Sequence, residues 1–209
     1  MPLRNRVDPS GEIRAVPARG EFFGNRGCIH NDRGEIIRRA QVRRWIVCLT
    51  EFKGRRRPLL RPGHYTELFF LDEVTAFAAG HRPCFECRRS AARAYAERFA
   101  EHHGLADPKV DAIDALLDAE RTVPADDPSR LLDHGALTAL PDGAMVRADD
   151  RFLAAREGLF LPWSFDGYGA PVRPDALPGP IFRVTPPSTL AVLARGYRPA
   201  FHSRAPGDA

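Results

Sequence analysis

Lysine is almost absent from this chain of 209 residues, in which Lys53 and Lys109 are two of 31 basic residues and arginine supplies the rest. No apolar stretch reaches the roughly 18 residues that a membrane-spanning helix needs. The N-terminal segment also lacks the apolar centre of a signal peptide. We therefore expect a cytoplasmic protein with no membrane partner. The sequence contains no P-loop, GxGxxG, HExxH or GxSxG motif, so it offers none of these nucleotide-binding and hydrolase signatures.

Positive charge is concentrated in the first half of the chain. Residues 1–100 contain 20 basic and 11 acidic residues, a net charge of +9, whereas residues 101–209 contain 11 basic and 16 acidic residues, a net charge of −5. Arginine forks match the oxygens of phosphate in bidentate geometry. The basic half therefore predicts contact with DNA or RNA, although a solvated basic face would explain the same composition without any partner.

The four cysteines are the most specific chemical feature of the sequence. Cys84 and Cys87 form a Cys-x-x-Cys motif, whereas Cys48 and Cys28 lie far upstream. Cysteines stay reduced in the cytoplasm, and zinc takes four such donors in a tetrahedron. We predict a zinc site of Cys28, Cys48, Cys84 and Cys87, with His30 as the alternative to Cys28 because the two share strand parity. A redox pair or inert core cysteines are the competing interpretations.

The pattern of apolar residues predicts an α+β fold. We expect a flexible arm over residues 1–20, a zinc-binding lobe over 21–104 and a C-terminal lobe of mixed helix and strand over 105–209, with one shared core or two. In the zinc-binding lobe a small antiparallel sheet and two helices surround the metal, with strands at 26–30, 42–50 and 65–71 and helices at 72–79 and from 84–87 to 103. The C-terminal lobe should contain a helix from Asp107-Pro108, a loop at 122–143, a hairpin around Asp149-Asp150, a strand at LFLPWSF, a Gly/Pro loop at 166–180, a strand at FRVT and a helix at 186–195.

The run DEVTAFAAGHRPCFECRR, residues 72–89, resembles the N-terminal metal-binding module of the Ada DNA-alkylation-repair family. The matching positions are Gly80, Arg82, Pro83, Cys84, Cys87 and Arg88, while His81 replaces an aromatic residue. The resemblance implies zinc binding at Cys84 and Cys87. It does not imply methyl transfer, because the family's methyl-accepting cysteine belongs to a Cys-x-x-x-Cys pair that this chain lacks. The motifs GNRG, FKGRRR, YTELFFLDE, RPCxxCRR and TPPST are also similar to those of a family of bacterial proteins, which implies no particular activity.

Candidate contacts with nucleic acid are basic and aromatic residues near the cysteines. The loop EFKGRRRP should present Arg55, Arg56 and Arg57 to phosphates, and Arg88 and Arg89 follow the cysteine motif. A solvated turn is the alternative for the loop. Trp45, Tyr65 and Phe69 would provide a surface for base stacking or, alternatively, belong to the core.

The leading hypothesis is a structural zinc protein that contacts nucleic acid through its basic half. One alternative is an enzyme that acts on a phosphodiester or on alkyl groups through the zinc site. Four cysteine ligands argue against hydrolysis because they leave no position for water, and three would reverse that argument. Acid–base chemistry by Glu51, Glu67, Asp72 and Glu73 with His64 or His81 competes with helix capping and surface pairing for the same residues. A zinc-stabilised module that binds another protein is the remaining alternative.

Overall fold

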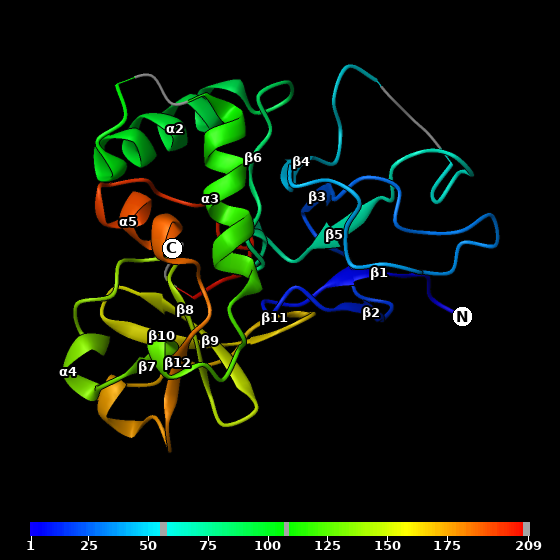
Figure 1. Ribbon diagram of the computed structural model, residues 1–209. Helices are drawn as coiled ribbons and strands as arrows, with labels where there is room; N and C mark the ends of the chain where they lie inside the picture. The colour runs from blue at the N-terminus through cyan, green and yellow to red at the C-terminus, as the bar shows by residue number, and fades with distance from the viewer. Residues whose placement is uncertain (55–57, 107–108, 207–209) are drawn as a thin grey trace.

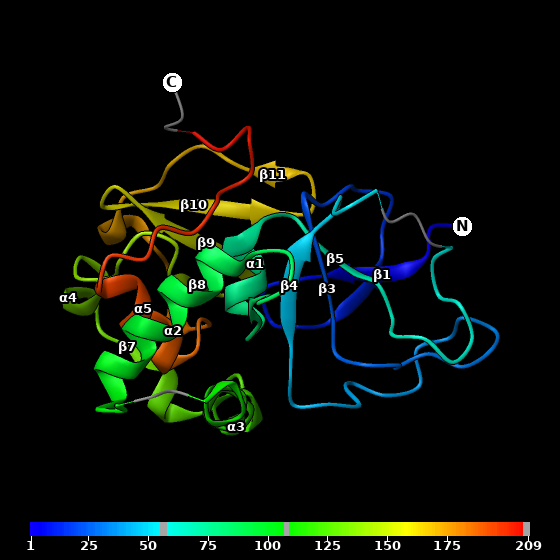
Figure 2. The same ribbon diagram turned by 90° about the horizontal axis from the view of Figure 1, so that it is seen from above.

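The computed structural model describes residues 1–54, 58–106 and 109–206. It confirms the α+β prediction, because helices pack against two six-stranded sheets. In Figure 1 the N-terminal sheet and its long loops lie on the right, most of the helices lie at the upper left and the second sheet lies below them. Figure 2 shows the same separation from above, with α3 (Val110–Thr122) seen end-on.

The N-terminal sheet is mixed rather than purely antiparallel. Its strand order is β2-β1-β5-β3-β4-β6, and β1 runs parallel to β5 while β4 runs parallel to β6. Strand β3 is antiparallel to both of its neighbours. The strands are β1 (Arg4–Val7), β2 (Ile13–Ala15), β3 (Phe22–Asn25), β4 (Ile46–Leu49), β5 (Leu68–Phe70) and β6 (Arg82–Pro83).

Two predictions for this region are wrong. Residues 1–20 are not a flexible arm, because they form the antiparallel pair of β1 and β2 and bury Val7 and Ile13 in the core. Asp8 closes the hairpin by accepting hydrogen bonds from the backbone N–H groups of Ser10 and Glu12, and Gly11 adopts a φ of 88° there. The strand predicted at 26–30 lies earlier, at β3, because Gly27 turns the chain with a φ of 89°.

Local sequence signals locate the helices well. Asp72 caps α1 by accepting a hydrogen bond from Thr75 N, and Gly80 follows the helix with a φ of 80°. Helix α2 ends at His103 as predicted but begins after both cysteines, because Arg88 is its N-terminal cap. Asp107 and Pro108, predicted to open the next helix, lie outside the described residues. The helices are α1 (Glu73–Ala78), α2 (Arg89–His103), α3 (Val110–Thr122), α4 (His134–Leu137) and α5 (Pro187–Ala194), with short 3-10 turns η1 (Pro128–Arg130) and η2 (Pro174–Ala176).

The second sheet is built from the C-terminal part of the chain, and its strand order is β11-β10-β9-β8-β12-β7. The predicted hairpin is confirmed as β8 and β9, with Asp149 at a φ of 49° in the turn. The predicted loop at 122–143 contains η1, β7 and α4. The strands are β7 (Leu131–Leu132), β8 (Met145–Ala148), β9 (Arg151–Arg156), β10 (Leu159–Ser164), β11 (Gly167–Tyr168) and β12 (Ile181–Arg183).

One hydrophobic cluster contains residues from both sides of the predicted boundary at residue 104, as in the alternative of a shared core. This cluster joins Val7, Val47 and Phe70 of the N-terminal sheet with Ile113 of α3 and Val192 of α5. A second cluster lies within the second sheet. The N-terminal sheet is therefore held against helices that come from both halves of the sequence. No helix in the described part of the chain is long and apolar enough to cross a membrane.

Candidate metal centre and its surroundings

Three cysteines converge beside the N-terminal sheet. The Sγ atoms of Cys48, Cys84 and Cys87 all lie within 4.8 Å of one another, although Cys48 is separated from the other two by more than 30 residues. Cys48 and Cys84 are buried and Cys87 is half-buried. This group could hold a metal ion.

Strand pairing explains how Cys48 reaches the Cys-x-x-Cys motif. Strand β6 runs parallel to β4 with Val47 opposite Pro83, and the backbone N–H of Cys84 donates to Val47 O at 3.0 Å. The ladder therefore fixes Cys84 next to Cys48. Arg82 anchors the same strand from the other side, because its guanidinium donates two hydrogen bonds of 2.8 Å to the carboxylate of Asp114.

Backbone donors around the motif favour thiolates. The N–H of Glu86 donates to Cys84 Sγ at 3.4 Å, and Arg88 N donates to Cys84 O at 3.0 Å to close the turn. The hydrogen bond from the Cys48 thiol, helped by the backbone N–H groups of Cys87 and Glu86, lowers the pKa of Cys84 to about 5. Hydrogen bonds from the Cys48 thiol and from the backbone N–H of Leu49 lower the pKa of Cys87. Because the Cys48 thiol donates to both Cys84 and Cys87, its own pKa is raised. Thiolate is the form that binds metals, so the group is electrostatically prepared for a cation.

Cys28 and His30, the two predicted candidates for the fourth donor, lie outside this group of three. The ring of His30 is engaged elsewhere, with Nδ1 2.6 Å from Thr66 Oγ1 and Nε2 3.3 Å from Arg61 O. These contacts give His30 a structural role instead of the predicted ligand role. Cys28 donates its S–H to His30 O at 3.7 Å and lines the same hollow as the three clustered cysteines, and its role as a ligand stays a prediction.

The predicted phosphate-binding arginines differ in their surroundings. Arg88 is only 10% exposed, because its guanidinium donates to Glu73 Oε1 at 2.6 Å and lies over the ring of Phe22. The structure therefore gives Arg88 a carboxylate partner in place of the predicted phosphate. Arg89 is exposed at the start of α2. The other three predicted arginines, Arg55, Arg56 and Arg57, lie outside the described residues.

The carboxylates next to the motif serve the fold. Asp72 accepts hydrogen bonds from Tyr168 OH at 2.7 Å and from the backbone N–H of His202 at 3.1 Å, in addition to capping α1. Glu73 accepts from Tyr197 OH at 2.8 Å as well as from Arg88. Both side chains are buried and join distant segments, which favours the capping interpretation over acid–base chemistry.

A hollow of about 1090 Å³ opens beside the cysteines. Half-buried aromatic side chains line it, and the rings of Phe23 and Tyr65 stack with centroids 6.3 Å apart. Phe69 lies next to them, with its centroid 6.4 Å from that of Phe23. Trp45, by contrast, is buried, so the core interpretation holds for that residue. Glu51 and Glu86 also line the hollow, so its wall is not uniformly positive.

An exposed arginine-rich segment precedes β4, and its last part, from residue 42, was predicted to be strand. Arg38, Arg39, Arg43 and Arg44 are all exposed just before β4, and Arg44 lines the hollow. Among the described residues, the only ion pair of these four arginines joins Arg43 Nε to Asp118 Oδ2, at 3.5 Å. The signal available in the sequence was the repeated Arg-Arg at 38–39 and 43–44.

Comparison of the chain with models of protein families, with curated proteins and with solved structures finds no match. The resemblance of residues 72–89 to the Ada metal-binding module therefore stays a prediction. What can be said of the site comes from its own geometry, which is a compact group of thiol donors at the edge of a partly aromatic hollow.

Proposed function

We propose that this chain is a structural zinc protein whose N-terminal half contacts nucleic acid. The observation that carries the proposal is the convergence of three sulfur atoms, from Cys48, Cys84 and Cys87, within 4.8 Å. Soft thiolate donors suit zinc better than magnesium or calcium, which take oxygen ligands. A metal here would connect Cys48 on β4 to Cys84 and Cys87, which lie in the segment between β6 and α2.

Zinc in a structural site takes four protein ligands, so one donor must join the three. Cys28 is the best candidate because it lines the same hollow and is half-buried. The chain around Gly27 would have to move for the Cys28 sulfur to reach the metal, because Cys28 lies outside the group of three. A site of four thiolates is closed to water, which fits a structural role.

Two features of the hollow support contact with nucleic acid. Arg44 lines it and the same exposed segment carries further arginines at 38, 39 and 43, whose side chains provide charge that attracts a phosphate backbone. The half-buried rings of Phe23, Tyr65 and Phe69 offer faces on which unpaired bases could stack. A single strand fits this combination better than a duplex, because stacking needs exposed base faces.

Elemental analysis of purified protein tests the metal. We expect one zinc per chain, and we expect Cys48→Ser, Cys84→Ser and Cys87→Ser each to lower the affinity by ~100-fold or more, since changes outside the ligand shell alone cost 10–100-fold. Glu86→Gln, between two of the ligands, is the matched control and should keep the metal. Metal-free protein, or a Cys48→Ser variant that binds zinc normally, would overturn the proposal.

Cys28→Ser decides the fourth ligand. With cobalt in place of zinc, the sulfur-to-metal charge-transfer band reports the number of bound thiolates. We expect this band to weaken in Cys28→Ser relative to the parent protein. An unchanged band would show that Cys28 is not a ligand.

Fluorescence anisotropy with a labelled single-stranded oligonucleotide tests the second half of the proposal. Removing two phosphate contacts in Arg38→Gln/Arg44→Gln should reduce the log–log salt slope by about 1.4, at ~0.7 per contact. Replacing Arg55, Arg56 and Arg57 together should weaken binding to all sequences alike. Arg93→Gln/Arg151→Gln, two exposed arginines away from the hollow, is the control. No binding at low salt would overturn the nucleic-acid half and leave the zinc half intact.

A second candidate function rests on the number of clustered sulfurs. If three cysteines are the complete protein ligand set, the fourth position is open to water, and zinc could activate that water to hydrolyse a phosphodiester. Hydrolysis of bis(p-nitrophenyl) phosphate by the zinc-loaded protein, lost in Cys84→Ser, would support this candidate. A cobalt spectrum that shows four thiolates would exclude it.

A further inference from the structure

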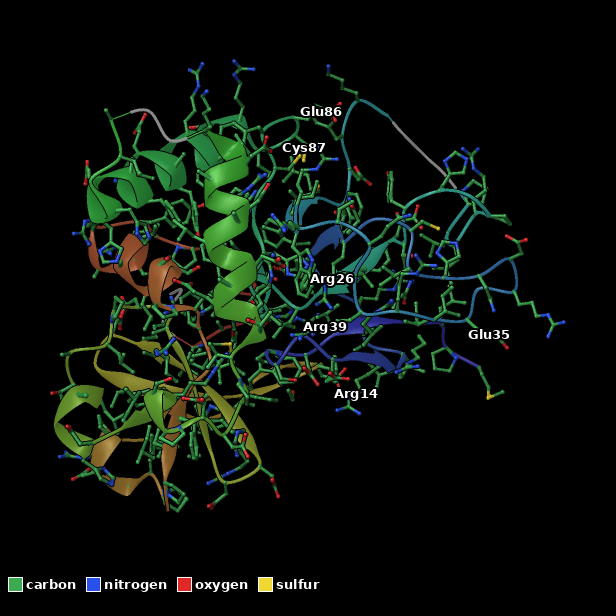
Figure 3. All side chains as sticks on the ribbon, in the orientation of Figure 1. Arg14, Arg26, Glu35, Arg39, Glu86 and Cys87 are labelled. Atoms are coloured by element: carbon green, nitrogen blue, oxygen red, sulfur yellow. The ribbon has the colours of Figure 1, made fainter. Side chains whose placement is uncertain are left out.

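A second cavity, of about 350 Å³, lies where the N-terminal lobe meets the second sheet and the end of α3. Five arginines line it, against two glutamates. They come from the loop before β4, the end of α3, η1, β8 and β12, as Arg39, Arg121, Arg130, Arg147 and Arg183. Figure 3 shows Arg39 and Arg26 close together beside α3 and β1, away from Cys87, so this cavity is separate from the candidate metal centre.

Four of the five arginines that line the cavity form no ion pair within the described residues. Within residues 1–54, 58–106 and 109–206, no ion pair is formed by Arg39, Arg130, Arg147 or Arg183, while Arg121 pairs with Asp118 at 3.1 Å. Glu120, one of the two lining acids, is already engaged because it accepts hydrogen bonds from the backbone N–H and the hydroxyl of Ser188. The lining therefore has an excess of positive charge, with five arginines against two glutamates.

Several buried donors in and behind the cavity have no acceptor. Arg121 is 7% exposed, and its Nε has no hydrogen-bond partner in the described structure. The same holds for Nε of Arg130 and for Nη2 of Arg26. The other nitrogens of Arg121 and Arg130 donate to backbone carbonyls, such as those of Gly80 and Val123. A buried N–H without a partner costs free energy, so the two Nε positions are expected to gain from a bound acceptor.

The guanidinium groups also crowd one another. Arg26, Arg39 and Arg121 surround the ring of Trp45, at 3.8, 5.6 and 4.4 Å from its centroid. Burial, followed by repulsion from neighbouring arginines, lowers the pKa of Arg26 and of Arg183. Positive charges held close together in a low-dielectric site attract an anion strongly.

The walls restrict what can enter. Ala78, Ala79, Phe152, Val184 and Pro186 form apolar surfaces, while the exposed side chains of Glu12 and Arg39 connect the cavity to solvent. Its volume is at the lower end of the range for small-molecule sites, about 300–1,000 Å³. The space suits a compact anion rather than a long polymer.

We propose that this arginine cavity binds a phosphate group carrying at least two negative charges, with pyrophosphate as the simplest ligand of that class. Guanidinium forks of Arg147 and Arg183 would grip the phosphate oxygens in bidentate fashion, and Arg121 and Arg130 would donate from the cavity wall. The phosphate belongs to a small phosphorylated molecule or to the end of a nucleic acid. This site does not depend on the metal or on the hollow beside the cysteines.

Isothermal titration and thermal unfolding with sodium pyrophosphate test the proposal, with sodium chloride at matched ionic strength as the reference. We expect saturable binding with one site per chain, and a rise in Tm of roughly 5–10 °C at 100 times Kd. Arg147→Gln and Arg183→Gln should each weaken binding about tenfold or more. Arg93→Gln, an exposed arginine on α2, should bind as the parent does.

The outcomes separate the proposal from its alternatives. An oligonucleotide with a 5′-phosphate that competes with pyrophosphate, while its 5′-hydroxyl counterpart does not, identifies the nucleic-acid source. Competition by nucleoside diphosphates alone identifies the small-molecule source. Lack of saturable binding, or an equal loss of affinity in Arg93→Gln and Arg183→Gln, would overturn the proposal.

Discussion

The candidate metal centre and the arginine cavity differ in how their charges are supported. The thiols of Cys84 and Cys87 receive backbone and thiol hydrogen bonds, and each cysteine lies at the end of a paired strand or the start of a helix. In the cavity, five arginines, of which only Arg121 is buried, lie near two glutamates, and most of their hydrogen bonds go to backbone carbonyls. Arg82, by contrast, is also buried but has a dedicated partner in Asp114. The ion pair of Arg82 and Asp114 stabilises the fold, whereas the arginines of the cavity that have no carboxylate partner are the ones that we propose bind a ligand.

Removing a dedicated partner should have the largest effect on stability. Asp114→Ala leaves Arg82, 2% exposed, as a buried unpaired charge, and we expect a loss of about 3–5 kcal/mol in the free energy of unfolding. Urea denaturation measures this loss. Asp175→Ala removes a carboxylate from the solvent-exposed pair with Arg173 and should leave the free energy of unfolding almost unchanged. Equal losses in the two variants would remove the distinction between buried and exposed partners.

A glycine behind the cavity provides an intermediate test. At Gly80, φ is +80°, and an added Cβ would lie 2.7 Å from Cγ and Cδ of Arg121. Gly80→Ala should therefore cost ~1–3 kcal/mol through backbone strain and displace Arg121, which weakens pyrophosphate binding. Gly196→Ala shares the positive φ but meets no atom within 4 Å, so it should strain the backbone and leave pyrophosphate affinity unchanged. Denaturation and titration of both variants check this pair.

Acid should destabilise the protein through His81, which is buried between Trp45 and Phe70. Burial and the positive charges of Arg26 and Arg121 hold the pKa of His81 well below its usual value of 6.5. Below about pH 6.5, His81 binds a proton in the unfolded chain but stays neutral in the native state. The free energy of unfolding therefore decreases as the pH is lowered, by up to about 1.4 kcal/mol per pH unit. Denaturation of the parent and of His81→Gln from pH 7 to 5 should show a shallower slope in the variant. Parallel slopes would show that His81 does not titrate in this way.

The smallest effect is expected when an unpartnered arginine is removed. Arg147→Gln and Arg183→Gln lose hydrogen bonds to the carbonyl oxygens of Asp149 and Thr185 but gain relief from repulsion, so stability should change by less than about 1 kcal/mol. Because salt screens repulsion, both variants should gain stability relative to the parent protein at low ionic strength. Denaturation at two salt concentrations measures this gain. A salt-independent loss of several kcal/mol would make these arginines structural.

Sequence reasoning succeeded where the signal was local or chemical. Asp72 and Gly80 delimit α1 through a side-chain cap and a left-handed residue, and both can be read directly from residue type. Cys48 joined the motif because sulfur donors are scarce and zinc needs several. Strands β1 and β2 were not predicted, because Asp8 and Gly11 were not recognised as the turn of a hairpin.

The arginine cavity could not be predicted for a different reason. Its members come from five separate segments between residues 39 and 183, and each looks like an ordinary solvated charge in the sequence. Only the packing of the second sheet against the end of α3 brings them together. Arg88 is the opposite case. Its position next to the cysteines in the sequence predicted a phosphate contact, but in the fold its guanidinium pairs with the buried carboxylate of Glu73.

The joining of both ends of the chain has a consequence for biosynthesis. Tyr197 and the backbone N–H of Ala200 bond to Glu73, Ser203 bonds to Glu21, and Val192 completes the first core. On a translating ribosome, the amino-terminal strands therefore keep apolar surface exposed until residues 192–203 have left the exit tunnel. Such a chain depends on chaperones during that interval more than one whose early strands close upon themselves.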